Sequence, residues 1–235
     1  MREDNPTPRD SIDTLFLLCV NNLGGAELSI FRIIRGLKKK GMRVGLAVYG
    51  AQPELVPDDL GVPVIRLEAL RTVQAAVPFY RALRRYAPRV IVSSLTDTNV
   101  MALFISLVSG RHAKVIAVEH SLMARVKALC GYLHYSLLQG LMLFLYPRAG
   151  AIVAVSKSLA VDLRERLPSP CRVETLYNPV LSTIPAPQSP SPHSWLEDGQ
   201  PPVVMGVGRL SEEKNFSLLI QAFAEAAQKR LGWPP

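Results

Sequence analysis

The sequence contains little cysteine for its length of 235 residues. The three cysteines, Cys19, Cys130 and Cys171, lie far apart and form no C-x-x-C pair, so neither a disulfide framework nor a cysteine-based zinc site is expected. A reduced, cytoplasmic setting fits this usage best. The first residues lack the apolar run of a secretory signal, so we do not expect export.

Aromatic residues are also scarce, at 7% of the chain, whereas basic residues exceed acidic ones and give a formal net charge of +8. A basic chain can bind nucleic acid, an anionic membrane surface or phosphate-bearing ligands. The absence of a dense stretch of basic and aromatic residues disfavours nucleic acid as the partner.

Several motifs of catalytic and cofactor sites are missing as well. The chain has no G-x-G-x-x-G fingerprint with its following acid, which disfavours a nicotinamide oxidoreductase. It has no Walker loop and no G-x-S-x-G nucleophile turn. It has no cluster of metal-ligating side chains either, so we expect neither a metal nor a cofactor.

The hydrophobic content of 49% and the alternation of short apolar runs with helical patterns predict a folded α/β chain. Predicted strands are residues 14–20, 43–49, 62–67, 89–94, 114–118, 151–155 and 172–176. Predicted helices are residues 26–40, 72–86, 99–109, a long stretch ending at 146, and 157–167. Strands that alternate with helices in this way predict a doubly wound, Rossmann-like parallel sheet.

Proline divides the rest of the chain. Seven of the 19 prolines lie between Pro179 and Pro202, which predicts an extended linker over 181–202. We therefore predict a disordered tail over 1–13, a Rossmann-like domain over 14–180, and the truncated start of a second α/β domain over 203–235. In that last part, 203–207 is a predicted strand and 214–230 a predicted helix, with Ser211 as its N-cap.

The first candidate site is Gly24-Gly25, between the first strand and the first helix. Backbone N–H groups at such a turn can approach a phosphate or a sugar closely, but a tight turn with nothing bound is an equal reading. Glu27 follows in the first helical turn. It either complements the helix dipole or binds a sugar hydroxyl.

The second candidate is Glu119-His120, directly after a predicted strand, where ligands bind in open parallel sheets. His120 can donate to a hydroxyl or a phosphate, although a lone histidine is more often structural. Glu119 is a substrate-binding candidate that can instead point back into the sheet. Asn178, at another strand end, is a substrate-binding candidate whose alternative is a turn before proline.

The third candidate, residues 206–215, places Arg209 and Lys214 around a strand-to-helix turn. Both side chains suit a diphosphate, Arg209 by a bidentate fork and Lys214 as a point charge, and the alternative is a solvated turn. Between the second and third candidates along the chain, Ser156 or Ser158 is expected to cap a helix.

Together these segments resemble the family 4 glycosyltransferases of the GT-B fold, in the family's order and over nearly the whole chain. The matching segments are Gly-Gly-Ala-Glu at 24–27, Glu-His at 119–120, Ala-Val-Ser-Lys at 154–157, Tyr-Asn-Pro-Val at 177–180, and Val-Gly-Arg-Leu with Glu-Lys-Asn at 207–215 before the helix at 219–223. The most specific segment is the last, with its Gly-Arg-Leu and Glu-Lys-Asn. Asn-Pro at 178–179 replaces the usual Asn-Gly.

The resemblance implies a GT-B N-terminal domain and a retaining, metal-independent transfer of a hexose from a nucleotide diphosphate sugar to a glycan or lipid-linked acceptor, as in polysaccharide and cell-envelope synthesis. Arg209 and Lys214 match the positions that stabilise the leaving diphosphate. His120 matches a position near the transferred sugar, and Gly24 and Gly25 match a loop near the diphosphate.

The family's later E-x7-E segment has no counterpart here, so we expect little or no transfer by this chain alone. The alternative is a non-catalytic fragment that binds a sugar, a phosphate or a partner. Residues 128–147 carry no charge, which predicts a partly buried helix. Contact of 125–148 with the inner face of a membrane is the other reading, helped by Arg125, Lys127 and Arg148.

Overall fold

The computed structural model describes residues 12–110, 113–121, 132–179, 193–197, 199–200, 203–208, 210–212 and 214–228. The chain divides into two compact units, Met1–Val180 and Leu181–Pro235, and each is described by itself.

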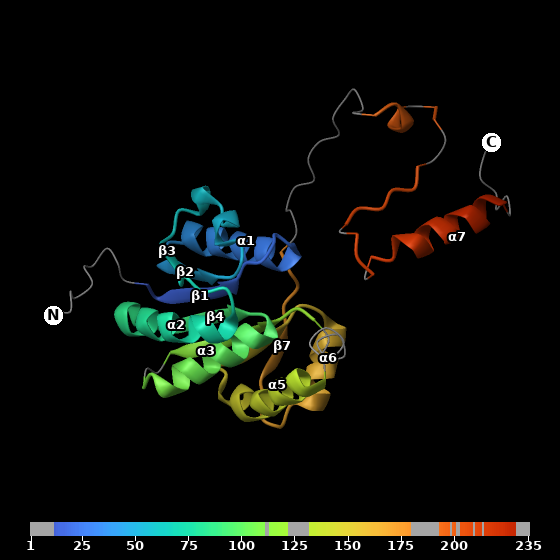
Figure 1. The fold of residues 1–235 in the computed structure, drawn as a ribbon. Coiled ribbons are helices and arrows are strands. Elements are labelled where there is room, and N and C mark those ends of the chain that lie inside the picture. The colour runs from blue at the N-terminus through green and yellow to red at the C-terminus, as the bar shows by residue number, and fades with distance from the viewer. Residues whose placement is uncertain are drawn as a thin grey trace. The chain divides into compact units, whose positions relative to one another are not determined.

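The first unit is built on a seven-stranded sheet in the order β3-β2-β1-β4-β5-β6-β7, with every neighbouring pair parallel (Figure 1). The strands are β1 (Thr14–Cys19), β2 (Val44–Tyr49), β3 (Val64–Arg66), β4 (Val90–Ser94), β5 (Lys114–Glu119), β6 (Ala151–Ala154) and β7 (Val173–Thr175). β1 and β2 are almost wholly apolar because helices or short helical turns cover both of their faces. The predicted doubly wound parallel sheet is confirmed.

Helices cover the two faces of this sheet unequally. α1 (Gly25–Lys39) packs on one face, where Ile30, Phe31 and Ile34 form a core with Phe16 and Leu18 of β1. The opposite face carries α2 (Thr72–Tyr86), α3 (Thr96–Val108), α5 (Tyr132–Leu145) and α6 (Lys157–Arg166). α3 packs between α2 and α5.

The predicted elements agree with these bounds to within a few residues, with two differences in the first unit. α3 begins at Thr96, three residues before the predicted start. Ile12 and Asp13, assigned to the tail by the sequence analysis, belong to the fold: Ile12 is only 4% exposed, and the Asp13 carboxylate pairs with Arg43 at 2.7 Å. The remainder of the predicted tail lies outside the described residues.

The second unit contains α7 (Phe216–Gln228) as its longest described element. The predicted strand over 203–207 is wrong: these residues form no strand, and Val207 is 82% exposed. A strand needs a hydrogen-bonded neighbour, and the described part of this unit offers none. The predicted cap at Ser211 is also wrong, because Asn215 accepts from the Leu218 N–H at 3.2 Å and α7 starts directly after it.

Candidate functional site at the carboxyl edge of the sheet

The candidate residues of the first unit gather at the carboxyl ends of the strands. β1 and β4 are neighbours in the middle of the sheet, and the strand order reverses between them. In open parallel sheets, ligands bind in the crevice outside this reversal point. Gly24 follows β1, Ser94 ends β4 and His120 follows β5, so three segments distant in sequence reach one edge.

The turn at Gly24-Gly25 forms the N-terminus of α1, as predicted. The Gly24 N–H donates to Glu27 Oε2 at 2.9 Å, so the Glu27 side chain folds back on its own helix. Glu27 is only 7% exposed, which favours the helix-capping role over contact with a sugar hydroxyl. Gly25 is exposed, and a Cβ atom there would meet nothing within 4 Å. The helix N-terminus thus remains open to an anionic group at Gly25.

Glu119 points away from the edge and into the core. Its side chain is 1% exposed and accepts hydrogen bonds from Thr96 Oγ1 at 2.8 Å, from Asn99 Nδ2 at 2.9 Å and from the Tyr146 hydroxyl. Tyr146 lies in the short 3-10 helix η4 (Tyr146–Arg148) after α5. Burial raises the pKa of Glu119, and the three donors oppose that rise. The side chain of Glu119 thus points back into the fold, which was the alternative to its role as a substrate-binding candidate.

His120 projects from the opposite face of the sheet, because successive residues of a strand alternate between faces. Its Nε2 lies 2.9 Å from Ser94 Oγ, and its ring is half-buried. Burial lowers the pKa of His120 to about 4, so the imidazole is neutral near pH 7. With one ring nitrogen held by Ser94, a neutral ring can offer the other to a ligand as a donor or an acceptor.

His120 and α1 share one face of the sheet. Register pairs Phe16 with Val92 and Val92 with Ile116, and Phe16 packs in the α1 core. Every second residue of a strand points to the same face. Ser94, two residues after Val92, and His120, four residues after Ile116, therefore continue that face to the carboxyl edge. The N-terminus of α1 and the His120 ring thus occupy the same side of the same edge.

The end of the first unit returns to this side of the sheet. Asn178 is half-buried after β7, and the carbonyl of Pro179 accepts from Arg32 Nη1 of α1 at 3.0 Å. This bond fixes the chain after β7 against α1, so Asn178 is held close to α1. Ser156, and not Ser158, accepts from the Leu159 N–H at 3.2 Å and caps α6.

The candidates of the second unit are only partly described. Arg209 lies outside the described residues. Lys214 is exposed and packs its methylene groups along Gly208, where a Cβ atom would lie 3.2 Å from Lys214 Cγ. Glycine at 208 thus lets the lysine stem lie close to the backbone of the turn.

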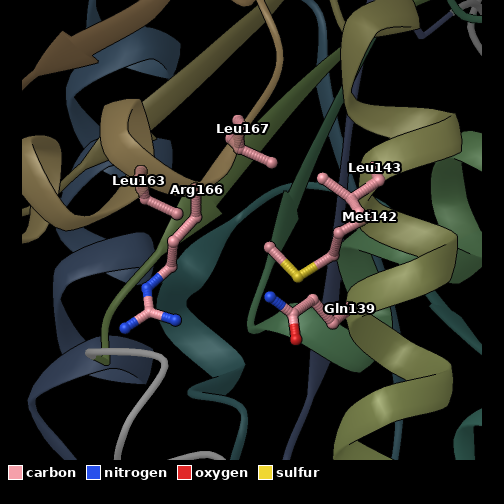
Figure 2. Close-up of a pocket in the computed structure, with 6 residues that line it drawn as sticks. All are labelled: Gln139, Met142, Leu143, Leu163, Arg166 and Leu167. Atoms are coloured by element: carbon pink, nitrogen blue, oxygen red, sulfur yellow. The ribbon is translucent and has the colours of Figure 1, made fainter.

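Cavities open between described residues of the first unit. The one between α5 and α6 has room for about one water, at ≈ 10 Å³, and is lined by Met142, Leu163 and Arg166 among others (Figure 2). A larger hollow of ≈ 390 Å³ opens at the carboxyl ends of β2 and β3, with Arg66 and Glu68 on its wall. In the described residues no group of three or more histidine, cysteine or acidic side chains is placed to hold a metal ion.

Sequence reasoning missed the polar residues that hold Glu119 and His120 in place, namely Ser94, Thr96, Asn99 and Tyr146. One signal was present: two serines end a buried strand, and Asn99 begins a predicted helix whose next residues are mostly apolar. A polar side chain in a buried segment needs a partner, so each was a candidate for a bond to another buried polar group.

Solved structures with the same fold are glycosyltransferases. The chain superposes on HepE from Anabaena in complex with UDP (TM-score 0.56, 13% identity, 71% of this chain and 44% of that one). It also superposes on sucrose-phosphate synthase from Thermosynechococcus elongatus (0.57, 12%, 70% and 48%) and on the lipopolysaccharide outer core galactosyltransferase WaaB (0.55, 15%, 76% and 50%). The fold is therefore that of a GT-B glycosyltransferase N-terminal domain, and the chain spans half or less of each of these proteins.

The sequence gives the narrower assignment. The profile of Glycosyltransferase Family 4 matches residues 23–181, which is more than half of the chain. The chain belongs to glycosyltransferase family 4. No curated protein sequence matches it significantly.

Proposed function

We propose that this chain is the acceptor-binding half, with the first part of the donor-binding half, of a retaining glycosyltransferase that moves a hexose from a nucleotide diphosphate sugar to a glycan or lipid-linked acceptor. The observation that carries the proposal is the neutral His120 ring at the reversal point of a family 4 sheet, on the same side as the open N-terminus of α1.

The chemistry places different demands on the two units. When the sugar–phosphate bond breaks, negative charge develops on the departing diphosphate, and fixed cations stabilise it without a proton transfer. Arg209 and Lys214 are the proposed cations, and the reaction needs no metal in this scheme. His120 is proposed to donate a hydrogen bond to the transferred sugar, a role that a neutral ring performs without repelling a cation-like sugar centre.

The ligands and names of the structural relatives support the donor class. HepE was crystallised with UDP, and also with UDP-glucose, and WaaB is named a galactosyltransferase. For this chain, a nucleotide sugar is the corresponding proposal. The hollow beside β2 and β3 is the proposed place for part of the acceptor, since it lies at the same edge and offers both Arg66 and Glu68.

The setting proposed for the reaction is the cytoplasmic side of the cell envelope. No helix in the described ranges is long and apolar enough to cross a membrane. Of the segment 125–148, for which the sequence suggested contact with a membrane surface, the first part lies outside the described residues and the second is α5 with η4.

The first test measures donor binding. Calorimetric titration of the 235-residue chain with UDP-glucose and GDP-mannose is expected to show weak binding, because the chain has no counterpart of the family's E-x7-E segment. Tight binding by the chain alone would show that the donor site is complete and would contradict this part of the proposal.

The second test measures turnover in a polypeptide extended to the length of the relatives. Lys214→Ala and Arg209→Ala are each expected to lower release of nucleoside diphosphate from the donor by 100-fold or more, in keeping with the loss of one preorganised group, about 10²–10³. Lys39→Ala, an exposed lysine on α1, is the matched control and should leave turnover unchanged. Full activity in the Lys214→Ala variant would refute the diphosphate role and favour the non-catalytic alternative.

A further inference from the structure

A buried serine holds one nitrogen of the His120 ring. Ser94, the last residue of β4, is only 1% exposed, and its Oγ lies 2.9 Å from His120 Nε2. Within the part of the chain that the structure describes, this nitrogen is the only hydrogen-bond partner of the Ser94 hydroxyl. The contact joins the ends of the neighbouring strands β4 and β5, so it lies at the edge where a ligand would reach the ring.

The burial of the serine decides which group donates. Burial lowers the pKa of His120 to about 4, so near pH 7 the ring holds a single proton, on Nε2 or on Nδ1. If Nε2 carried the proton, it would donate to Oγ, and the buried hydroxyl proton of Ser94 would have no acceptor among the described residues. A buried donor without a partner is costly, whereas a hydroxyl that donates to an unprotonated Nε2 is satisfied. The contact therefore favours the ring form in which Nδ1 carries the proton.

The other ring nitrogen is open to a ligand. His120 Nδ1 has no hydrogen-bond partner in the described ranges, and it is not one of the buried side-chain atoms that lack a partner there. Water or a ligand can therefore reach it. A proton on Nδ1 is then available to an acceptor outside the fold.

The backbone after Ser94 is held in a strained conformation that keeps the serine in place. Leu95 has a φ of 79° and a ψ of 143°, a combination rare for a residue other than glycine. Two bonds stabilise it: the Leu95 N–H donates to the Val118 carbonyl at 3.2 Å, and Thr96 Oγ1 donates to Glu119 Oε2 at 2.8 Å. Three successive residues at the end of β4 are thus bonded to the end of β5, and the serine has little freedom to turn away from the imidazole.

We propose that Ser94 is a positioning residue: its hydroxyl donates to His120 Nε2, keeps the ring proton on Nδ1, and so presents the ring to a ligand as a hydrogen-bond donor. A donor at Nδ1 selects an oxygen that can accept, such as a hydroxyl oxygen of the transferred sugar. Ser94 itself touches no ligand in this arrangement. The place of the proton is a property of the ring alone, whereas its use in sugar transfer rests on the proposed function.

Nitrogen NMR of the histidine rings tests the place of the proton on the chain itself. The chain has four histidines, so the ring signals are few, and the signals that His120→Gln removes identify His120. At pH 7 we expect Nδ1 to have the shift of a protonated nitrogen and Nε2 that of an unprotonated one, with an excess of about tenfold of this form, as one net hydrogen bond supplies. A proton on Nε2 in the native chain would overturn the proposal, whether or not any variant folds.

Two serine variants separate the Ser94 bond from a general change at the strand end. Ser94→Ala is expected to bring the two ring forms to within about threefold of each other, because the bond that selects between them is lost. Ser93→Ala is the matched control. Ser93 also lies in β4 and is 0% exposed, but its Oγ has no hydrogen-bond partner in the described residues, so the His120 signals should not change. Unchanged signals in Ser94→Ala, or an equal change in Ser93→Ala, would refute the role of Ser94.

Turnover in the extended polypeptide distinguishes this proposal from the proposed function. Ser94→Ala is expected to lower kcat by about tenfold with little change in KM, and to have no further effect in a His120→Gln background. If His120→Gln leaves kcat unchanged, the proposed part of His120 in transfer is wrong, and the NMR result still decides the role of Ser94. If His120→Gln lowers kcat and Ser94→Ala does not, the positioning role of Ser94 is wrong.

Discussion

Replacing the buried Glu119 tests how the carboxyl edge is organised. In Glu119→Ala, the Tyr146 hydroxyl loses the acceptor it has in the fold, and Thr96 loses one as well. Asn99 Nδ2 keeps a second bond, to the Val118 carbonyl at 3.0 Å. A buried donor without a partner costs about 1–3 kcal/mol, and the removed side chain leaves a cavity. We therefore expect Glu119→Ala to lower the free energy of unfolding by about 3–5 kcal/mol.

Glu119→Gln separates shape and hydrogen bonding from charge. The glutamine oxygen can accept from Tyr146 and Asn99, and its amide can donate to the Thr96 hydroxyl, which is able to accept. The expected loss at pH 7 is therefore only about 1 kcal/mol.

The pH dependence of this variant has a definite sign. Burial raises the pKa of Glu119 above the ordinary glutamate value of 4.5, so the folded state holds its proton when the unfolded state has released it. As pH rises above 4.5, Glu119 ionises first in the unfolded state, and the free energy of unfolding falls. The fall ends when the carboxyl of the folded state also ionises. Glu119→Gln removes this loss, and its stability relative to the native chain should rise with pH over the same window.

Urea denaturation followed by circular dichroism measures these differences. Glu174→Ala is the matched control, because Glu174 is also a strand glutamate but is exposed and paired with Arg172 at 3.0 Å, an interaction worth within about 1 kcal/mol. An unchanged stability of Glu119→Ala, or an equal loss in Glu119→Gln and Glu119→Ala, would refute the idea that Glu119 organises the strand end through its three donors.

Three other predictions concern the same unit. The stability that a neutral His120 contributes should be complete above the free value of 6.5 and be lost as pH falls toward 4, by about 3 kcal/mol in total, and denaturation of His120→Gln should lack this slope. Gly50→Ala should destabilise the fold by more than about 1 kcal/mol in urea, because φ is 120° there and a Cβ atom would lie 2.5 Å from the Val20 carbonyl oxygen; an unchanged midpoint would contradict this. Ser156→Ala should cost about 1 kcal/mol through loss of the bond to the Leu159 N–H, whereas Ser158→Ala should cost little.

Local pattern was sufficient for most elements of the first unit, because the central strands β1 and β2 are buried apolar runs and helices such as α1 and α2 have one apolar face. It failed where distant partners decide. Thr96 and Thr98 are poor helix formers, and the helix predicted from the sequence starts only at Asn99. In the fold, Thr96 and Asn99 donate to Glu119, and Thr98 lies 2.7 Å from the Tyr49 hydroxyl, and these contacts extend the helix.

The candidate site shows the same limit. Alternation along a strand predicts that Glu119 and His120 face opposite ways, but not which of them enters the core. Tyr146 and Asn99 decide it, and both are distant in sequence. The predicted strand over 203–207 is wrong for a similar reason. An apolar run forms a strand only when another strand lies beside it.

The strand order also has a consequence for the order of synthesis. β1 is made first and occupies the middle of the sheet, and β2 and β3 extend it in one direction. β4 then joins β1 on its other side. Each later strand, from β5 to β7, is added beside the strand made just before it. A nascent chain can therefore build the sheet outward as it leaves the ribosome, with one growing edge at a time. Both final edges, β3 and β7, are only three residues long, which leaves little backbone for another chain to pair with.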